Sequence, residues 1–235
     1  MLELFAYGDT GWGDELLAGL GITLQLAILA LPVGLLLGFV FSGMSLANSR
    51  ALRAGARLYT TTMRGLPEIL TLFVIYNGAG ILLNAIMSTM GAEPVEFSPM
   101  AAGVIALGMV FGAFAAEVLR GAFQSLDPGQ TEAAQAIGMT RWQIFIRVKV
   151  PQVWRFALPG LGNLWINLLK DTALVSVIAL DDLMRMTKVA AGFTKLPFNF
   201  YLAACLIYWV LCLASEVGLA KLERRANRGV RRAGA

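Results

Sequence analysis

The sequence predicts an all-α integral membrane protein with about five transmembrane helices in a single domain, residues 1–235. Its 235 residues are 57% hydrophobic and only 14% charged, whereas a soluble domain carries about 25% charged residues. The apolar residues also come in long blocks, without the stripes that mark the amphipathic helices of a soluble core. Both observations argue against one soluble domain with a large core.

A transmembrane helix needs about 20 mainly apolar residues, and five stretches of the sequence meet this condition. They are residues 16–43, 66–90, 99–123, 153–179 and 198–220. The fourth stretch is interrupted by Pro159, Asn163, Asn167, Lys170 and Asp171. Gly160 and Gly162 there, and Gly78 and Gly80 in the second stretch, fit broken helices, although close packing is the commoner reason for glycines in membrane helices. In the third stretch, three small residues recur at a spacing that favours close helix packing: Gly103, Gly108 and Gly112.

Five transmembrane helices place the first connector, the third connector and the carboxyl-terminal tail on the same side of the membrane. Most basic residues lie in these three segments. These segments hold fifteen of the 19 basic residues: Arg50, Arg53, Arg57, Arg64, Arg120, Arg141, Arg147, Lys149, Arg155, Lys221, Arg224, Arg225, Arg228, Arg231 and Arg232. The positive-inside rule then puts the amino terminus outside and the carboxyl terminus in the cytoplasm. The connector 170–197 weakens the pattern, because it carries four basic residues that three aspartates only partly balance. We attribute the net charge of +4 to the basic cytoplasmic segments, which set the topology and can contact membrane lipid. We do not take it as a sign of nucleic-acid binding.

The connector between the third and fourth stretches, residues 127–151, predicts a short first helix. Asp127 can cap it, with Pro128 at its first position. Gly138 suits the left-handed residue that follows a helix. Small side chains in between would allow close approach by another protein, although a plain surface helix explains them as well. The face in question consists of Ala133, Ala134 and Ala136, which are small, and Ile137.

A second short helix is predicted directly afterwards. Thr140 can cap it, and Gln143 stands three residues on, where a capping box has its partner. The segment then alternates apolar and basic residues, "WQIFIRVKV", up to Pro151. We expect this helix to lie at the membrane surface and to end at Pro151.

The connector resembles the EAA loop of ABC-importer permeases. That loop reads E-A-A, three residues, G, nine residues and I-x-L-P, and the same spacing joins Glu132, Ala133, Ala134, Gly138 and the motif "VKVP", with valines for the isoleucine and leucine. The resemblance covers most of the chain. The stretches "YTTTMRGLPEIL", "AAEVLRGAFQSLDPGQTEAA", "RFALPGLGNLWINLLKDTALVSV" and "LERRANRGVRRA" resemble polar amino-acid permeases of the histidine, octopine and nopaline group.

This resemblance implies the transmembrane domain of a type I ABC importer in a bacterial inner membrane. Glu132, Ala133, Ala134 and Gly138 would belong to a coupling helix that docks on an ATPase subunit. The implied partners are a second permease, two copies of the ATPase and a periplasmic solute-binding protein. A heterodimer of permeases is the family pattern, and a homodimer stays open. The implied cargo is a basic amino acid or an opine: histidine, arginine, lysine, octopine or nopaline.

Several kinds of chemistry are excluded by the residues themselves. The chain has no G-x-x-x-x-G-K-[ST] motif, so it lacks the loop that cradles ATP phosphates. It has no histidine, which removes Ser/His/Asp and Cys/His catalysis and His-based metal sites. We therefore expect no catalytic residue, cofactor or metal ligand, and ATP hydrolysis by a separate subunit. A secondary transporter or channel subunit is the alternative, but no inverted repeat is evident.

Acidic residues in or beside apolar spans are candidates for a substrate path, because such groups normally face a bundle interior or a water-filled cavity. Glu68, Glu117 and Asp171 would line this path and favour a cationic solute. Each also has a local explanation. Glu68 could sit at the interface near Arg64, Glu117 could pair with Arg120 one turn away, and Asp171 could serve a helix break.

Overall fold

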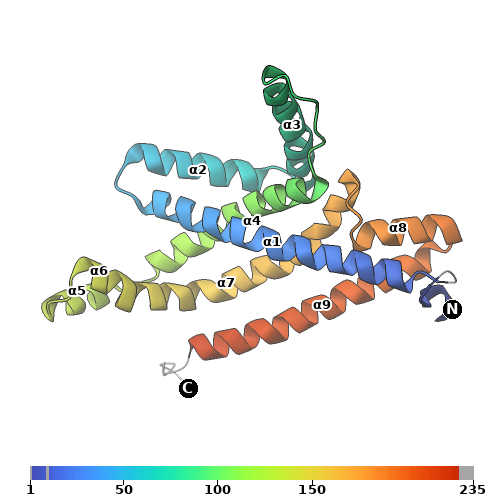
Figure 1. The fold of residues 1–235 in the computed structure, drawn as a ribbon. Helices are drawn as coiled ribbons and strands as arrows, with labels where there is room; N and C mark the ends of the chain where they lie inside the picture. The colour runs from blue at the N-terminus through green and yellow to red at the C-terminus, as the bar shows by residue number, and fades with distance from the viewer. Residues whose placement is uncertain (1, 9–10, 228–235) are drawn as a thin grey trace.

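The computed structural model describes residues 2–8 and 11–227, which form a bundle of helices (Figure 1). The elements are η1 (Leu2–Phe5), α1 (Gly13–Leu46), α2 (Arg50–Gly65), α3 (Glu68–Thr89), α4 (Pro99–Gln124), α5 (Pro128–Ala136), α6 (Arg141–Ile144), η2 (Phe145–Lys149), α7 (Val150–Asp171), η3 (Thr172–Ile178), α8 (Leu183–Thr194) and α9 (Pro197–Ala226). Three basic residues of the tail lie outside the described residues: Arg228, Arg231 and Arg232.

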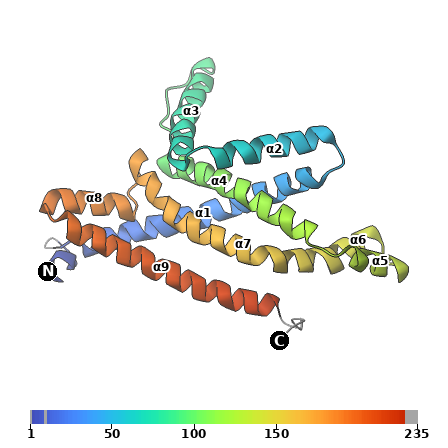
Figure 2. The ribbon, with the colours of Figure 1, turned by 180° about the vertical axis from the view of Figure 1, so that it is seen from behind.

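The predicted all-α membrane fold is confirmed. Helices α1, α3, α4 and α9 are long and apolar enough to cross a membrane, and the bent pair of 141–178 and α8 makes a fifth if it counts as one span. Helices α1, α4, α7 and α9 run lengthwise beside one another, and α3 stands out from them at a steep angle (Figures 1 and 2). Helices α5 and α6 lie at the same end as the carboxyl end of α9, opposite α8. This arrangement agrees with the predicted topology.

Helix α4 is the centre of the bundle, and glycines let α1 lie close against it. A Cβ at Gly108 would come within 2.9 Å of Val33 Cγ1, and one at Gly112 within 2.7 Å of Leu37 Cβ. A Cβ at Gly103 would likewise meet a leucine methyl at 3.0 Å. The predicted packing face of α4 is confirmed, because only residues without a side chain allow this approach.

Helix α2 was not predicted, because its segment had been read only as a charged connector. Ser49 caps it by accepting a hydrogen bond from Leu52 N at 3.5 Å. One face packs on the bundle, with Ala56 and Thr60 buried. The hydroxyl of Tyr59 reaches across and donates to the carbonyl of Met109 on α4, at 2.6 Å. Helix α2 is therefore amphipathic, and Arg53, Arg57 and Arg64 border its buried face, where they line a pocket against α4.

The fourth stretch is broken after Asp171, as the sequence allows, but a break at Pro159 is wrong, because α7 runs through Pro159 without interruption. A proline in a membrane helix is tolerated where neighbouring helices satisfy the freed backbone. The two glycines there serve packing instead. A Cβ at Gly160 would meet Val118 Cγ1 on α4 at 2.7 Å, and one at Gly162 would meet a methyl of Leu219 on α9 at 3.3 Å.

Gly78 and Gly80 do not break α3 either, since it is one helix from Glu68 to Thr89. The chain breaks later, at Thr172, where the 3₁₀ helix η3 replaces α7. Helix α8 then starts at an angle of 54° to the preceding segment. Asp182 caps α8, is fully buried and accepts a hydrogen bond from Arg185 N at 3.0 Å. The redirection of the chain is thus fixed by a buried cap and not by proline or glycine.

The two short helices of the connector form with the caps that the sequence predicts. Asp127 Oδ1 accepts a hydrogen bond from Gly129 N at 2.8 Å and opens α5. Gly138 has a φ of +80°, the left-handed conformation that suits a residue after a helix. Thr140 and Gln143 exchange side-chain and backbone hydrogen bonds in a complete capping box. Hydrogen bonds between neighbouring residues therefore fix the conformation of this connector.

The second short helix does not end at Pro151, contrary to the prediction. The chain passes from α6 through the π-helical turn η2 directly into α7. In that turn Val150 N donates to Phe145 O, one residue further back than in an α-helix. Pro151 is then a first-turn residue of α7, where its missing N–H costs little. Residues 141–171 consequently form one continuous helical rod.

Candidate functional site

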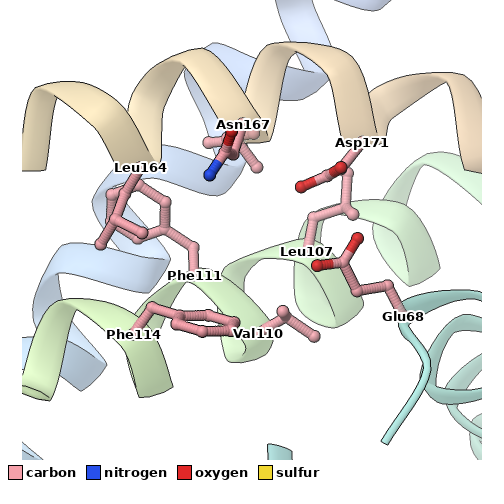
Figure 3. A pocket seen from close by; sticks show the side chains of 9 residues that line it. Glu68, Leu107, Val110, Phe111, Phe114, Leu164, Asn167 and Asp171 are labelled. Carbon is pink, nitrogen blue, oxygen red and sulfur yellow. The ribbon is translucent and has the colours of Figure 1, made fainter. Parts of the chain in front are cut away.

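Two acidic side chains from different helices meet in a pocket beside α4. Glu68 is the first residue of α3 and Asp171 is the last residue of α7. Both are half-buried, and both line a cavity of about 140 Å³. Their carboxyl groups point toward one another across this cavity (Figure 3). No basic group lies within salt-bridge distance of either one in the described part of the chain.

The remaining wall of this acidic pocket is mostly apolar. Asn167 adds one amide, one helical turn before Asp171, and points into the pocket (Figure 3). The other lining residues are Leu107, Val110, Phe111, Phe114, Leu164 and Leu168. Such a surface suits a ligand with a methylene chain and a cationic end, because the chain buries apolar area while the charge meets two carboxylates.

Glu117 lies in a different pocket, between α2 and α4. Its Oε2 is 2.6 Å from Arg120 Nη2, and the pair is about one third exposed. This second cavity, of about 430 Å³, is rich in arginine, and we call it the basic pocket. Its charged lining residues are Arg53, Arg57, Arg64, Arg120 and Glu117. The three acidic residues predicted to line a substrate path therefore lie in two places. Glu68 and Asp171 share the acidic pocket, and Glu117 is paired with Arg120.

The sequence predicts only a topological role for the arginines of α2. In the structure, Arg53, Arg57 and Arg64 line one pocket, and the Arg64 guanidinium lies 5.3 Å from the ring centroid of Phe114, which lines the acidic pocket. A signal was present, since Arg50, Arg53, Arg57 and Arg64 recur at helical spacing after a serine that can cap a helix.

The connector residues project from the end of the bundle. Glu132, Ala133 and Gly138 are exposed, and Ile137 has 78% of its surface exposed. Ala134 differs, since it is buried against its own chain. The exposed side chains thus form a small surface at the tip of the bundle (Figures 1 and 2), held by the caps described above.

A third polar feature runs between α7 and α9. Asn163, Lys170 and Glu216 line a groove of about 500 Å³, and all three are exposed. Asn167 borders both this groove and the acidic pocket. Charged groups in apolar spans are costly when they face lipid, so this side of the subunit is suited to contact with protein or water.

Membrane-length helices, a half-buried pair of acids beside α4 and a capped, exposed helix at one end are the arrangement expected of a membrane transport subunit. The chain belongs to the family described as binding-protein-dependent transport system inner membrane component, which matches residues 30–228. The resemblance to ABC-importer permeases and the inner-membrane location are therefore confirmed.

Curated relatives match the chain over almost its full length. The nopaline transport system permease protein NocQ of Agrobacterium fabrum is 43% identical over 232 residues, which are 98% of each chain. The octopine transport system permease protein OccQ of Rhizobium meliloti is 39% identical over 98% of each chain. The histidine/lysine/arginine/ornithine transport system permease protein HisQ of Escherichia coli is 39% identical over 95% of this chain and 98% of its own.

Solved structures show the same fold. An amino acid ABC transporter crystallised with histidines matches with a TM-score of 0.78 and 34% identity, over 91% of this chain and 95% of the other. The methionine ABC transporter MetNI, in an inward-facing conformation, matches with a TM-score of 0.70 over 91% of this chain and 96% of its own. At 16% identity, the second likeness concerns the fold alone. These comparisons confirm a type I importer fold and the role of an ABC-importer permease.

Proposed function

We propose that this permease imports a cationic amino acid or an opine, and that Glu68 and Asp171 bind its cationic group. The two facing carboxyl groups in the acidic pocket are the observation that carries this proposal. Two carboxylates at close range repel each other, and a cation between them relieves that repulsion. The printed names of relatives for nopaline, octopine and histidine, lysine, arginine or ornithine transport agree with such a solute.

A separate ATPase subunit would bind α5 and drive transport by this permease. Glu132, Ala133, Ile137 and Gly138 are exposed at the tip of the bundle and would make the contact. Ala134 is buried within the subunit, so it would support this surface without contacting the ATPase itself. An exposed isoleucine and small neighbours suit insertion into an apolar groove of a partner.

A second permease would complete the path on the side that carries the pockets. The groove with Asn163, Lys170 and Glu216 supports this, because a polar surface within apolar spans needs protein or water against it. Helices α3 and α9 also bury few of their residues within this subunit. The family pattern is a pair of permeases, two ATPase subunits and a periplasmic solute-binding protein. A heterodimer follows that pattern, and a homodimer is compatible with the same surface.

The mechanism is alternating access without covalent chemistry in the permease. ATP binding would close the ATPase pair, α5 would move with it, and the acidic pocket would open to the other side of the membrane. The permease contributes differential affinity for the solute in its two conformations. A secondary transporter would do the same without an ATPase, but it would not need the capped, projecting helix α5.

The test of the solute site uses the reconstituted complex of permeases, ATPase and binding protein in proteoliposomes. Replacing Glu68 with Gln and Asp171 with Asn should lower uptake of radiolabelled L-arginine by about tenfold or more, the equivalent of about 1.4 kcal/mol of binding energy. Glu117→Gln is the matched control, because Glu117 is paired with Arg120 outside the pocket. Equal uptake by all variants would show that the facing acids are structural.

The test of coupling uses Glu132→Lys in the same complex. The charge reversal should abolish stimulation of ATP hydrolysis by the loaded binding protein, while the subunit still inserts and assembles. Uptake that follows a proton gradient after ATP depletion would instead support the secondary transporter.

A further inference from the structure

The acidic pocket and the basic pocket are neighbours, and one aromatic ring separates them. Phe114 lines the acidic pocket. The guanidinium carbon of Arg64 lies 5.3 Å from the centroid of that ring, and Arg64 itself lines the basic pocket. Arg64 does not line the acidic pocket itself, so only a solute that extends from this pocket past Phe114 would have carboxylates at one end and a guanidinium at the other.

Of the arginines that line the basic pocket, Arg64 is the one that lies over the Phe114 ring. Arg120 is engaged by Glu117, at 2.6 Å. Arg53 donates to the backbone carbonyls of Ala47 and Asn48, at 2.8 and 3.0 Å. Across residues 2–8 and 11–227, no carboxylate lies within 4.0 Å of the Arg64 guanidinium, and the residue is exposed. The planar guanidinium of Arg64 rests on Phe114 with its N–H groups free to bind an anion.

The chain holds Arg64 and Glu68 in a fixed relation. Helix α2 ends at Gly65, and α3 begins at Glu68. Leu66 and Pro67 between them are extended, so the Cα atoms of Arg64 and Glu68 are at most about 14 Å apart at 3.3–3.6 Å per residue. Their side chains can therefore contact the two ends of one small solute.

We propose that Arg64 binds the carboxylate of the transported solute while Glu68 and Asp171 hold its cationic group. This inference rests on the proposed function and adds a second anchor to it. A guanidinium binds a carboxylate through two parallel N–H···O bonds, which fixes orientation as well as position. The permease would then select solutes that carry both a cation and a carboxylate at a set separation, and it would discriminate against amines that lack the carboxylate.

The experiment compares L-arginine with agmatine, which is arginine without its carboxylate. The purified permease–ATPase complex is placed in phosphatidylcholine nanodiscs, and equilibrium binding of each radiolabelled compound is measured. The wild-type complex should bind L-arginine more tightly. Arg64→Gln should weaken L-arginine binding by about tenfold or more and agmatine binding by less than about twofold, as expected for a lost hydrogen bond between charged groups. Agmatine binding by the variant also reports that its pocket is folded.

Arg57→Gln is the matched control, because Arg57 lines the basic pocket on the same helix but two turns further from Glu68. It should leave the ratio of the two affinities unchanged. Equal weakening of both ligands by Arg64→Gln would overturn the inference and leave the proposed solute site intact. If the Glu68→Gln and Asp171→Asn double variant binds both ligands as tightly as wild type, the proposed site fails and the inference falls with it.

Discussion

The contact between α1 and α4 depends on glycine, and Gly112→Ala tests this directly. A Cβ at Gly112 would lie 2.7 Å from Leu37 Cβ, 3.0 Å from the Tyr59 hydroxyl and 3.1 Å from Gly34 O. A Cβ and a backbone oxygen cannot turn aside, so the helices must separate. Overpacking of this kind costs about 1–3 kcal/mol, and each kcal/mol lowers the melting temperature by about 2–4 °C in a chain of this size.

The matched control for Gly112→Ala is Gly121→Ala, on the same helix. A Cβ at Gly121 would meet no atom within 4 Å in the part of the chain that the structure describes. Alanine there should be neutral or stabilising by up to about 1 kcal/mol, because it favours helix more than glycine does. Thermal unfolding in detergent, followed by tryptophan fluorescence, measures both variants. If the two melt together, α1 and α4 do not touch at Gly112 and the packing argument is refuted.

Three further changes probe single hydrogen bonds and one backbone conformation. Tyr59→Phe removes the bond to Met109 O and should lower stability by about 1 kcal/mol in the same melting assay; an unchanged melt would contradict a net contribution from that bond. Gly138→Val should abolish ATPase coupling because valine resists a positive φ, whereas Gly138→Asn should retain much of it; equal coupling in both would contradict a role for this backbone conformation. Asp182→Ala should lower stability by about 0.5–2 kcal/mol through loss of the α8 cap, and Asp182→Asn, which can still accept from Arg185 N, should stay near wild type. Equal melts for the two Asp182 variants would argue against the cap.

Features governed by nearby residues could be predicted from the sequence. The caps of Asp127 and Thr140 and the positive φ of Gly138 form because their partners lie within a few residues. Long apolar blocks likewise predicted the long helices, since length and composition alone decide whether a helix can cross a membrane. The glycines of α4 were read correctly because a regular spacing of small residues has few other uses in an apolar helix.

Features governed by distant residues could not be predicted. Pro159 suggested a break, but contacts of α7 with α4 and α9 keep the helix intact. The sequence did offer Asp171 as a residue at a helix break, and α7 ends there. That the buried Asp182 then redirects the chain could not be predicted. The pairing of Glu117 with Arg120 could be predicted from their spacing, and the structure confirms it. That Glu68 and Asp171 face each other could not be predicted, because it depends on the packing of α3 and α7 on α4.

The continuity of the helical rod from Arg141 to Asp171 suggests how a distant motor could change solute affinity. The rod begins beside α5 and ends at one of the two pocket carboxylates, and α7 alone, with 22 residues, is about 33 Å long at 1.5 Å per residue. Glu68 belongs to a different unit, because it is joined to α2 and not to α7. A pull on the rod would therefore displace Asp171 relative to Glu68 and alter the spacing that holds a cation. The π-helical turn at Phe145–Lys149 is the irregular part of this rod. We therefore expect the rod to bend mainly there, which would reduce the movement that reaches Asp171.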